Sequence, residues 1–162
     1  MLKNIELKIC IQEYDSISEL SPELQKICER AKENITRAYN PYSKFHVGAA
    51  ILLENGVIVD GSNQENAAYP SGLCAERVAM FYANSMYPDV KPIAVAVTAY
   101  FNGKFIARAV PPCGSCRQVL MESESRYKSD IKIILVGSEK IQVMNDIKSL
   151  LPLNFDSKYL DM

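Results

Sequence analysis

The chain has 162 residues, a length typical of one domain, and 48% of them are apolar while 23% are charged. This composition excludes an intrinsically disordered chain, and no apolar run approaches the roughly 20 residues that span a membrane. The net charge of −1 offers no broad cationic surface, so nucleic acid is not an expected partner. The first residues lack a signal-peptide core and the five cysteines are an odd number, which together favour a cytoplasmic protein with reduced thiols or metal ligands.

The N-terminal part of the chain predicts a strand followed by a helix. Apolar and polar residues alternate from Ile5 to Ile11, which is typical of a strand at the edge of a sheet. Ser21-Pro22 then supplies a cap and a proline at the first helical position, and apolar residues at helical spacing follow. We expect this helix to end before Pro41.

A hairpin and a long loop come next. Alternating apolar residues over 47–53 and 57–59 flank Asn55-Gly56, a dipeptide that favours a two-residue hairpin turn. Residues 61–73 hold two glycines and a proline among polar residues, without apolar periodicity, and therefore predict a long loop. Ordered loops of this length are often functional.

The rest of the chain alternates between helices and strands. In chain order, the sequence predicts a helix over 74–86, strands over 93–98 and 105–110, a helix over 114–127, a strand over 131–136 and a short helix over 146–151. Such alternation indicates an α/β fold, with a mixed sheet covered by helices on both faces. We expect residues 1–20 to form a strand extension that precedes a single domain over 21–162.

Three cysteines stand at the starts of two predicted helices. Cys74 is followed by Glu76 two residues later, and Cys113 and Cys116 form a Cys-x-x-Cys pair. That pair alone fits a redox dithiol or half of a structural zinc site. A third cysteine favours a catalytic metal site, because three protein ligands leave a fourth position open. Helix N-termini also stabilise thiolates.

The other metal-ligating residue types have simpler interpretations. His46, the only histidine, lies between apolar residues of a predicted strand and is expected to be a strand residue rather than a ligand. Cys10 lies in the first predicted strand and Cys28 on the apolar side of the first helix, so we expect both to be small buried residues.

Five short motifs occur in a characteristic order: Tyr42–Ala50, Asn63–Pro70, Cys74–Arg77, Pro112–Gln118 and Leu150–Phe155. Together they resemble the small homotetrameric zinc-dependent cytidine deaminases over roughly residues 22–155. The resemblance implies a three-layer α/β/α fold with a mixed sheet of about five strands. Residues 1–20 precede the usual start of that family, so their strand is an addition at the sheet edge.

The resemblance also implies a catalytic centre. Cys74, Cys113 and Cys116 are the implied ligands of one zinc ion per chain, and Glu76 is the implied carrier of protons during hydrolysis. Three thiolates outweigh the charge of one zinc ion, so positive compensation is needed. Arg77 matches the family's arginine that donates hydrogen bonds to a ligand thiolate.

Substrate contacts follow from the same resemblance, since composition alone would make these residues ordinary loop and core residues. The implied contacts are Asn63 and Glu65 with the ribose hydroxyls, Phe45 and the backbone of Ala75 with the pyrimidine, and Tyr69 and Phe155 with the pocket of a neighbouring subunit. A homotetramer with shared active sites is therefore implied.

The implied activity is hydrolytic deamination of free cytidine and deoxycytidine to uridine and deoxyuridine, in pyrimidine salvage. One alternative is an aminoacylnucleoside-antibiotic deaminase of the blasticidin type, against which the ribose-type residues 63–66 and Arg77 argue. Another is a non-catalytic zinc module that binds a partner, which would not require Glu76. A nucleic-acid deaminase is disfavoured, because such enzymes usually carry histidine at the position of Cys74 and have basic surfaces.

Overall fold

The computed structural model describes residues 1–160, so the last two residues of the expected domain lie outside the described part. Its helices are α1 (Pro22–Asn34), α2 (Ala75–Met86) and α3 (Gly114–Tyr127). Its strands are β1 (Gln12–Tyr14), β2 (His46–Leu53), β3 (Ile58–Ser62), β4 (Pro92–Phe101), β5 (Lys104–Phe105), β6 (Lys132–Val136) and β7 (Ile141–Met144). Short 3-10 turns lie at Ile17–Glu19, Ile35–Arg37, Tyr69–Ser71 and Ser157–Tyr159.

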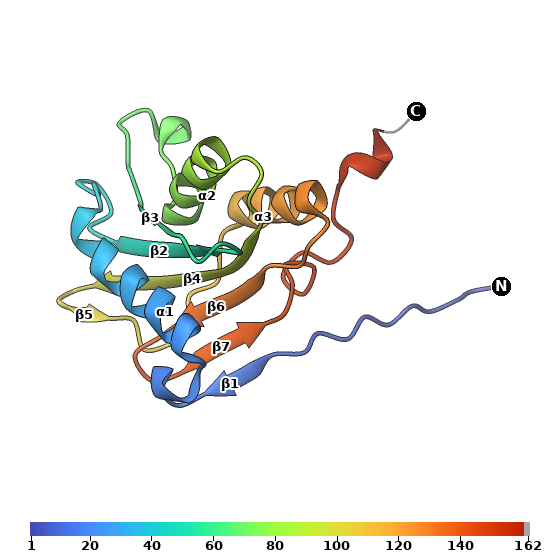
Figure 1. Ribbon diagram of the computed structural model, residues 1–162, viewed down its shortest axis with the longest axis horizontal. Helices are drawn as coiled ribbons and strands as arrows, with labels where there is room; N and C mark the ends of the chain where they lie inside the picture. Colours follow the sequence, from blue (N-terminus) through green and yellow to red (C-terminus); the bar gives the residue numbers. More distant parts are fainter. Residues whose placement is uncertain (161–162) are drawn as a thin grey trace.

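All seven strands form one mixed sheet (Figure 1). The order is β1-β7-β6-β4-β2-β3, and the two-residue β5 pairs with β4 beside this path. Among the described strands, β4 and β6 pair in parallel and every other pair is antiparallel. The mixed sheet and the extra edge strand are confirmed, and β7 is an addition that the sequence pattern did not predict.

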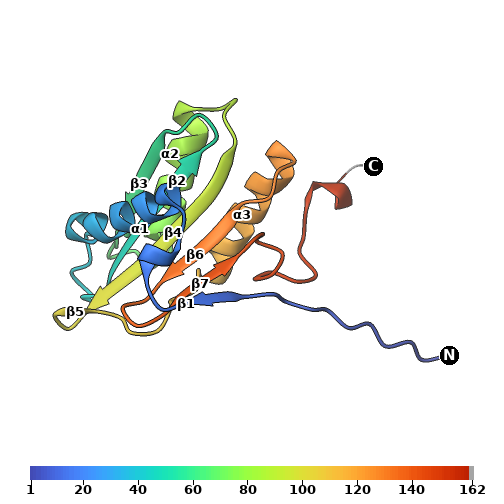
Figure 2. The ribbon, with the colours of Figure 1, turned by 60° about the horizontal axis from the view of Figure 1, so that its bottom comes forward.

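Helices cover both faces of the sheet, which confirms the three-layer architecture (Figure 2). Successive side chains of a strand point to opposite faces. Ala50 of β2 and Ile134 of β6 therefore pack in the core under α1, while their neighbours Ile51 and Ile133 pack under α2 and α3. All four side chains are fully buried, which is why these strands are apolar on both faces.

Locally encoded elements match their predictions. The helix predicted over 114–127 is α3, and α1 begins at Pro22 and passes into a 3-10 turn that ends at Arg37, before Pro41. Gly56 has φ +84° in the turn between β2 and β3, a conformation that glycine adopts without strain.

The strand predicted over Ile5–Ile11 is wrong in position. These residues are exposed and have no strand partner, and the edge strand is β1, which begins at Gln12. Gln12 pairs with Val143, and β7 ends one residue later at Met144. The chain before Gln12 therefore passes beyond the end of its only neighbour. For the same reason Cys10 is exposed rather than buried, whereas Cys28 is buried as expected.

The strand predicted over 105–110 is also wrong, because only Lys104–Phe105 pair with β4. After Phe105 the backbone takes other partners. The Ser138 N–H donates to the Ile106 carbonyl and the Glu139 N–H donates to the Ala107 carbonyl. This segment therefore follows the turn between β6 and β7 instead of extending a ladder.

The short helix predicted over 146–151 is replaced by turns. Two side chains take the backbone donors that begin this segment. The Ile147 N–H donates to Oε1 of Glu124 in α3, and the Ser149 N–H donates to Oδ1 of Asp146. These bonds favour a turn conformation over a helical one.

Gly61 permits a close approach between β3 and the start of α2. A methyl group at this position would lie 2.3 Å from the Ala75 carbonyl oxygen and 2.7 Å from the Ala79 nitrogen. Gly61→Ala should therefore push the first turn of α2 outward and lower the free energy of unfolding by about 1–3 kcal/mol. Chemical denaturation measures the effect.

Gly114→Ala is the matched control for this prediction. It adds the same methyl group at the start of α3, where nothing lies within 4 Å. Its stability should equal or slightly exceed that of the parent. Equal stability of both variants would show that the contact between β3 and α2 is not tight.

Candidate active site

A cavity of about 800 Å³ opens where the start of β2, the loop over 63–73 and the first turn of α2 meet the loop that leads into α3. Its walls include eight of the residues predicted for the site: Phe45, Asn63, Glu65, Tyr69, Cys74, Glu76, Arg77 and Cys113. Three others, Ala75, Cys116 and Phe155, are not among the residues that line it. The volume lies within the range of small-molecule sites.

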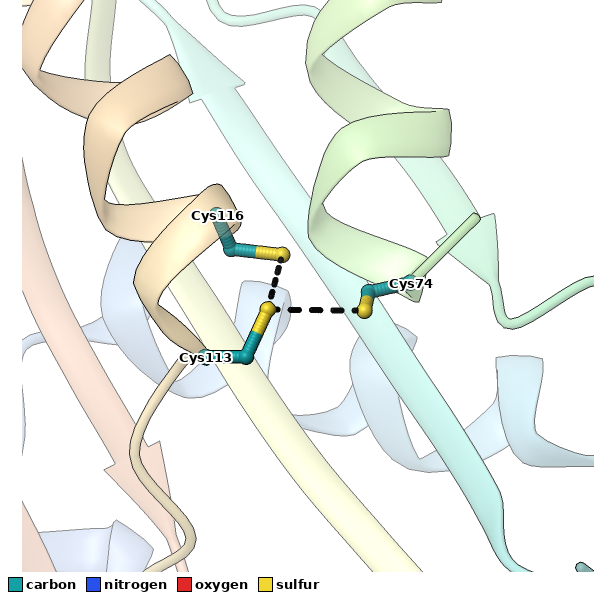
Figure 3. Close-up of side chains that lie close together, drawn as sticks. All are labelled: Cys74, Cys113 and Cys116. Carbon is teal, nitrogen blue, oxygen red and sulfur yellow. Dashed lines mark hydrogen bonds between the residues drawn. The ribbon is translucent and has the colours of Figure 1, made fainter. Parts of the chain in front are cut away.

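The three cysteine sulfurs lie close together where α2 and α3 begin (Figure 3). Cys74 and Cys113 are the residues directly before α2 and α3, and Cys116 lies in the first turn of α3. Sγ of Cys113 is 3.7 Å from Sγ of Cys74 and 3.5 Å from Sγ of Cys116, and all three sulfurs lie within 4.8 Å of one another. Sulfurs bound to one zinc ion at about 2.3 Å in a tetrahedron are ~3.8 Å apart. The cluster therefore has the donor type and the spacing of a zinc site.

The sulfurs also perturb one another electrostatically. Hydrogen bonding to Cys116, and further to Arg77 and Cys113, lowers the pKa of Cys74 to about 5 although burial opposes the shift. The hydrogen bond to Cys74 and burial raise the pKa of Cys116 far above its usual range. A divalent cation that bound all three sulfurs would displace the protons they hold.

Glu76 is a buried carboxyl group with an unsatisfied atom. It lies in the first turn of α2, is 4% exposed, and lines the cavity. Burial is the main cause that raises its pKa, and the neighbouring Cys74 adds to the shift. Its Oε2 has no hydrogen-bond partner among the described residues. Buried polar atoms usually have partners, so this atom indicates a ligand that completes the site.

Arg77 lies beside the cluster, as the resemblance implies. Its Nη2 is 3.8 Å from Sγ of Cys74 and 3.4 Å from the carbonyl oxygen of Gly72. A guanidinium at this distance offsets part of the negative charge of a thiolate.

The side chains of Asn63 and Glu65 both make hydrogen bonds to the backbone of the cavity wall. Asn63 donates from Nδ2 to the Phe45 carbonyl at 2.9 Å and accepts from the Val47 N–H at 2.8 Å. Oε2 of Glu65 accepts from the N–H groups of Tyr42 and Ser43. The hydrogen bond from the Ser43 side chain is the largest cause that lowers the Glu65 pKa, so this carboxylate is ionised near neutral pH.

Three aromatic residues, Tyr42, Phe45 and Tyr69, also line the cavity. The ring of Phe45 lies 5.7 Å from that of Phe101, centroid to centroid. Tyr69 is 75% exposed and meets Tyr42 edge to face at 5.8 Å. Tyr69 is therefore at the rim of the cavity rather than inside it.

Phe155 does not fill the core of its own chain. Its side chain is 56% exposed and stacks on Tyr159, and the C-terminal segment stands apart from the sheet in Figure 1. Gln118 of α3 donates a hydrogen bond of 2.9 Å to the Phe155 carbonyl, which anchors the backbone of the segment but not the ring. Ala75, by contrast, is fully buried and is not among the residues that line the cavity.

The sequence predicts no role for Arg117, although this residue lies within the motif Pro112–Gln118. Its Nε donates to the Pro112 carbonyl and its Nη1 donates to the Leu150 carbonyl, each at 2.8 Å. Arg117 therefore holds the residue before Cys113 together with the C-terminal segment. Other cavity residues went without a role too: Tyr42, Ser43, Val97, Val110 and Pro111. The proline-rich run before Cys113 is the one signal that could have identified Val110 and Pro111.

His46 and Cys28 lie outside the cluster, as expected. Nδ1 of His46 is 3.1 Å from the Ile35 carbonyl oxygen, and its ring packs edge to face on Tyr100. Cys28 is fully buried in α1, and burial raises the pKa of its thiol to about 12.

Comparisons with known proteins agree with this geometry. Residues 21–129 match the family described as cytidine and deoxycytidylate deaminase zinc-binding region. A cytidine deaminase of Halalkalibacterium halodurans is 43% identical over 98 residues, which cover 60% of this chain and 70% of the relative. The crystal structure of cytidine deaminase from Burkholderia pseudomallei has a TM-score of 0.67 and 34% identity, and the match covers 80% of this chain and 97% of that structure.

A blasticidin-S deaminase of Bacillus cereus is also similar, at 31% identity over 132 residues, which cover 80% of this chain and 90% of the relative. The identity to this relative is lower than the 43% found for the cytidine deaminase. From the family match and these relatives, the chain belongs to the cytidine and deoxycytidylate deaminase family.

Proposed function

We propose that the protein hydrolyses free cytidine and deoxycytidine to uridine and deoxyuridine. One water enters the reaction and one ammonia leaves, so C4 exchanges its amino group for oxygen. The observation that carries the proposal is the buried Glu76 carboxyl group, which has an unpartnered oxygen and lines one cavity together with Cys74 and Cys113. A module that only binds a partner has no need for this costly group.

We assign Cys74, Cys113 and Cys116 as the ligands of one zinc ion per chain. The sulfur spacing and the family's zinc-binding description support this assignment. When bound, zinc supplies Lewis-acid chemistry that makes water a nucleophile near neutral pH. Arg77 offsets the net negative charge of three thiolates through its contact with Cys74.

Glu76 carries the protons of the reaction. Its carboxylate takes one proton from the attacking water and delivers it to ring N3, then takes the second proton from the oxygen added to C4 and delivers it to the amino group, which leaves as ammonia while C4 keeps the oxygen as a carbonyl. Because burial raises its pKa, Glu76 is a stronger base than an exposed glutamate and is able to hold the proton between these transfers.

The remaining cavity residues hold the nucleoside. The Glu65 carboxylate accepts a hydrogen bond from a ribose hydroxyl. Asn63 makes a further hydrogen bond to the ribose, besides those that its amide makes with Phe45 and Val47. Phe45 packs against the pyrimidine ring, and the backbone of Ala75 recognises its polar edge. Tyr69 contacts a neighbouring subunit in the proposed assembly, and its exposed position at the rim of the cavity supports this role.

We further propose a cytoplasmic homotetramer that acts in pyrimidine salvage. The outer face of α2 supports assembly, because Phe81, Tyr82 and Met86 are each about half exposed there. The ring of Phe155 is likewise uncovered. Within residues 1–160, the helices lack the length and apolar character required to cross a bilayer.

The function is tested with purified, zinc-loaded protein. Cytidine and deoxycytidine should lose their near-ultraviolet absorbance with stoichiometric release of ammonia. Blasticidin S is the second substrate to test, because the Bacillus cereus relative bears the name of that activity. Turnover of blasticidin S without turnover of cytidine would overturn the proposed substrate, and no turnover of either would favour the binding module.

Phe155→Ala tests the shared pocket. The side chain is exposed in its own chain, so its loss should change stability by only about 0.5 kcal/mol or less. If Phe155 completes the pocket of a neighbour, the variant should keep its zinc and show a KM for cytidine about 5- to 30-fold higher, the effect of losing ~1–2 kcal/mol of binding. Steady-state kinetics on the folded oligomer measures this change.

Mixed assemblies sharpen this test. Co-assembled Phe155→Ala and Glu76→Gln chains contain some pockets with an intact Glu76 and an intact Phe155 from the adjacent chain. These pockets should restore part of the low KM. If hybrid tetramers verified by native mass spectrometry show only the high KM of the Phe155→Ala parent, the shared pocket is refuted.

A further inference from the structure

Residues 1–11, here called the N-terminal arm, leave β1 and extend away from the rest of the molecule in both views (Figures 1 and 2). Their apolar side chains have no cover. Ile5 is 82% exposed, Leu7 60%, Ile9 51% and Ile11 48%. The arm is the direct continuation of an edge strand, and the strand beside it, β7, ends at Met144, one residue past the pair of Gln12 and Val143.

The composition of the arm is that of a strand. Branched apolar residues at every second position share one face of an extended chain, and Glu6, Lys8 and Cys10 share the other. An uncovered strand of this kind has free backbone donors and acceptors along both edges, which makes it a template for another strand.

We propose that the arms of two copies of this chain pair with each other as an antiparallel β-ribbon, with Leu7 on the two-fold axis. This pairing is separate from the shared active site proposed above and uses none of its residues. It supplies each arm with the strand partner that its own sheet lacks.

Self-complementarity identifies a second copy as the partner. Residues directly opposite in an antiparallel pair share a face. With Leu7 on the axis, Ile5 lies opposite Ile9 of the other copy, so apolar residues meet. In the same register Glu6 lies opposite Lys8 of the other copy, and this ion pair occurs twice in the ribbon.

The neighbouring registers are disfavoured by charge or by pattern. An axis at Glu6 places two glutamates opposite each other, and an axis at Lys8 places two lysines opposite each other. An axis between two residues places apolar residues opposite polar ones. Over the central residues 5–9, the register centred on Leu7 avoids all three faults.

The ribbon also leaves room for both molecules. Five residues separate Leu7 from the start of β1 at Gln12, a distance of about 17 Å in an extended chain. The two copies of β1 then begin about 33 Å apart, at opposite ends of the ribbon. Two short strands alone are only marginally stable, so a reversible association is expected.

Disulfide trapping tests the register. Leu7→Cys in a Cys10→Ser background should form a dimer linked through position 7, because the two sulfurs meet on the axis. Ile5→Cys in the same background is the matched control, since its two copies are offset by about 13 Å along the ribbon, beyond disulfide reach. The two native Cys10 residues are offset by about 20 Å and should not link either. The experiment uses zinc-loaded protein, and peptide mapping by mass spectrometry identifies the linked positions.

Charge exchange tests the pairing without cysteine chemistry. Glu6→Lys and Lys8→Glu should each weaken ribbon association about tenfold, measured by sedimentation velocity, because each places like charges opposite each other. Mixing the two variants should restore association, since each Lys then faces a Glu. Cytidine turnover should stay unchanged throughout, which keeps this result independent of the proposed function.

The proposal fails under any of three results. Linkage of Ile5→Cys or native Cys10 as efficient as that of Leu7→Cys would mean that the arms meet without a register. Absence of linkage at position 7 would mean that the arm folds onto its own chain or awaits a different protein. If a mixture of the two charge variants associates no better than either variant alone, the proposed ion pairs between Glu6 and Lys8 do not form.

Discussion

Glu76→Gln should retain the fold and the zinc ion while lowering turnover of cytidine by at least about 10²-fold, the effect typical of losing a general acid–base group. Glutamine has nearly the same shape as glutamate but is unable to take and release a proton. Its amide also fits a buried position without the cost of a buried charge, so stability should not fall. Single-turnover kinetics and metal analysis measure both parts of the prediction.

Glu124→Gln is the matched control, because Glu124 is the second buried glutamate with an unpartnered Oε2. It lies outside the cavity, and its Oε1 accepts from the N–H groups of Ile131 and Ile147. An amide oxygen is able to accept both bonds, so turnover should stay near that of the parent. Near-normal turnover by Glu76→Gln would show that another group carries the protons.

Cys113→Ala should abolish zinc binding and reduce cytidine turnover to background. Sγ of Cys113 lies between the other two sulfurs, 3.7 Å from that of Cys74 and 3.5 Å from that of Cys116, so its loss leaves a two-sulfur site. Metal binding contributes directly to folding stability, and the melting temperature should therefore fall as well. Elemental analysis and thermal unfolding, with and without a chelator, measure these effects.

Cys10→Ser is the control for this second prediction. Cys10 is a free and exposed cysteine outside the cluster, so its replacement should change neither the zinc content nor the melting temperature. Zinc content that stays at one ion per chain in Cys113→Ala would refute the ligand assignment, whatever the activity of that variant.

Short-range patterns were sufficient where neighbouring residues decide the structure. The helix over 114–127 has good helix formers and matches α3, and Asn55-Gly56 determines the hairpin between β2 and β3. These elements depend on propensity and turn geometry, which are properties of adjacent residues.

The failed predictions depend on partners that are distant in the sequence. Residues 5–11 have the correct alternation for a strand, but β7 is too short to pair with them. Residues 146–151 have a helical pattern, but the Ile147 N–H reaches a carboxylate 23 residues earlier in the chain. Such contacts are invisible in a window of neighbouring residues and override local propensity.

The candidate site shows the same division. The spacing of the cysteines and of Glu76 identified the cluster from the sequence. Few residue types bind metals, and the predicted helix starts bring these residues into the same region of the fold. The contact between Arg117 and Leu150 spans 33 residues, and no local pattern marks it. Val97 resembles a core residue in the sequence, and only the folded chain shows that it lines a cavity.

One guanidinium, that of Arg117, fixes two carbonyls from different parts of the chain. One belongs to Pro112, directly before Cys113 of the cysteine cluster, and the other to Leu150, which leads to Phe155. The N–H groups of arginine point in fixed directions within one plane, so neither carbonyl shifts without straining the bond to the other. The C-terminal segment is therefore not exchangeable independently of Arg117. A graft of this segment from a relative has to begin before Leu150 and preserve the arginine, or it will disturb the approach to the host's catalytic centre.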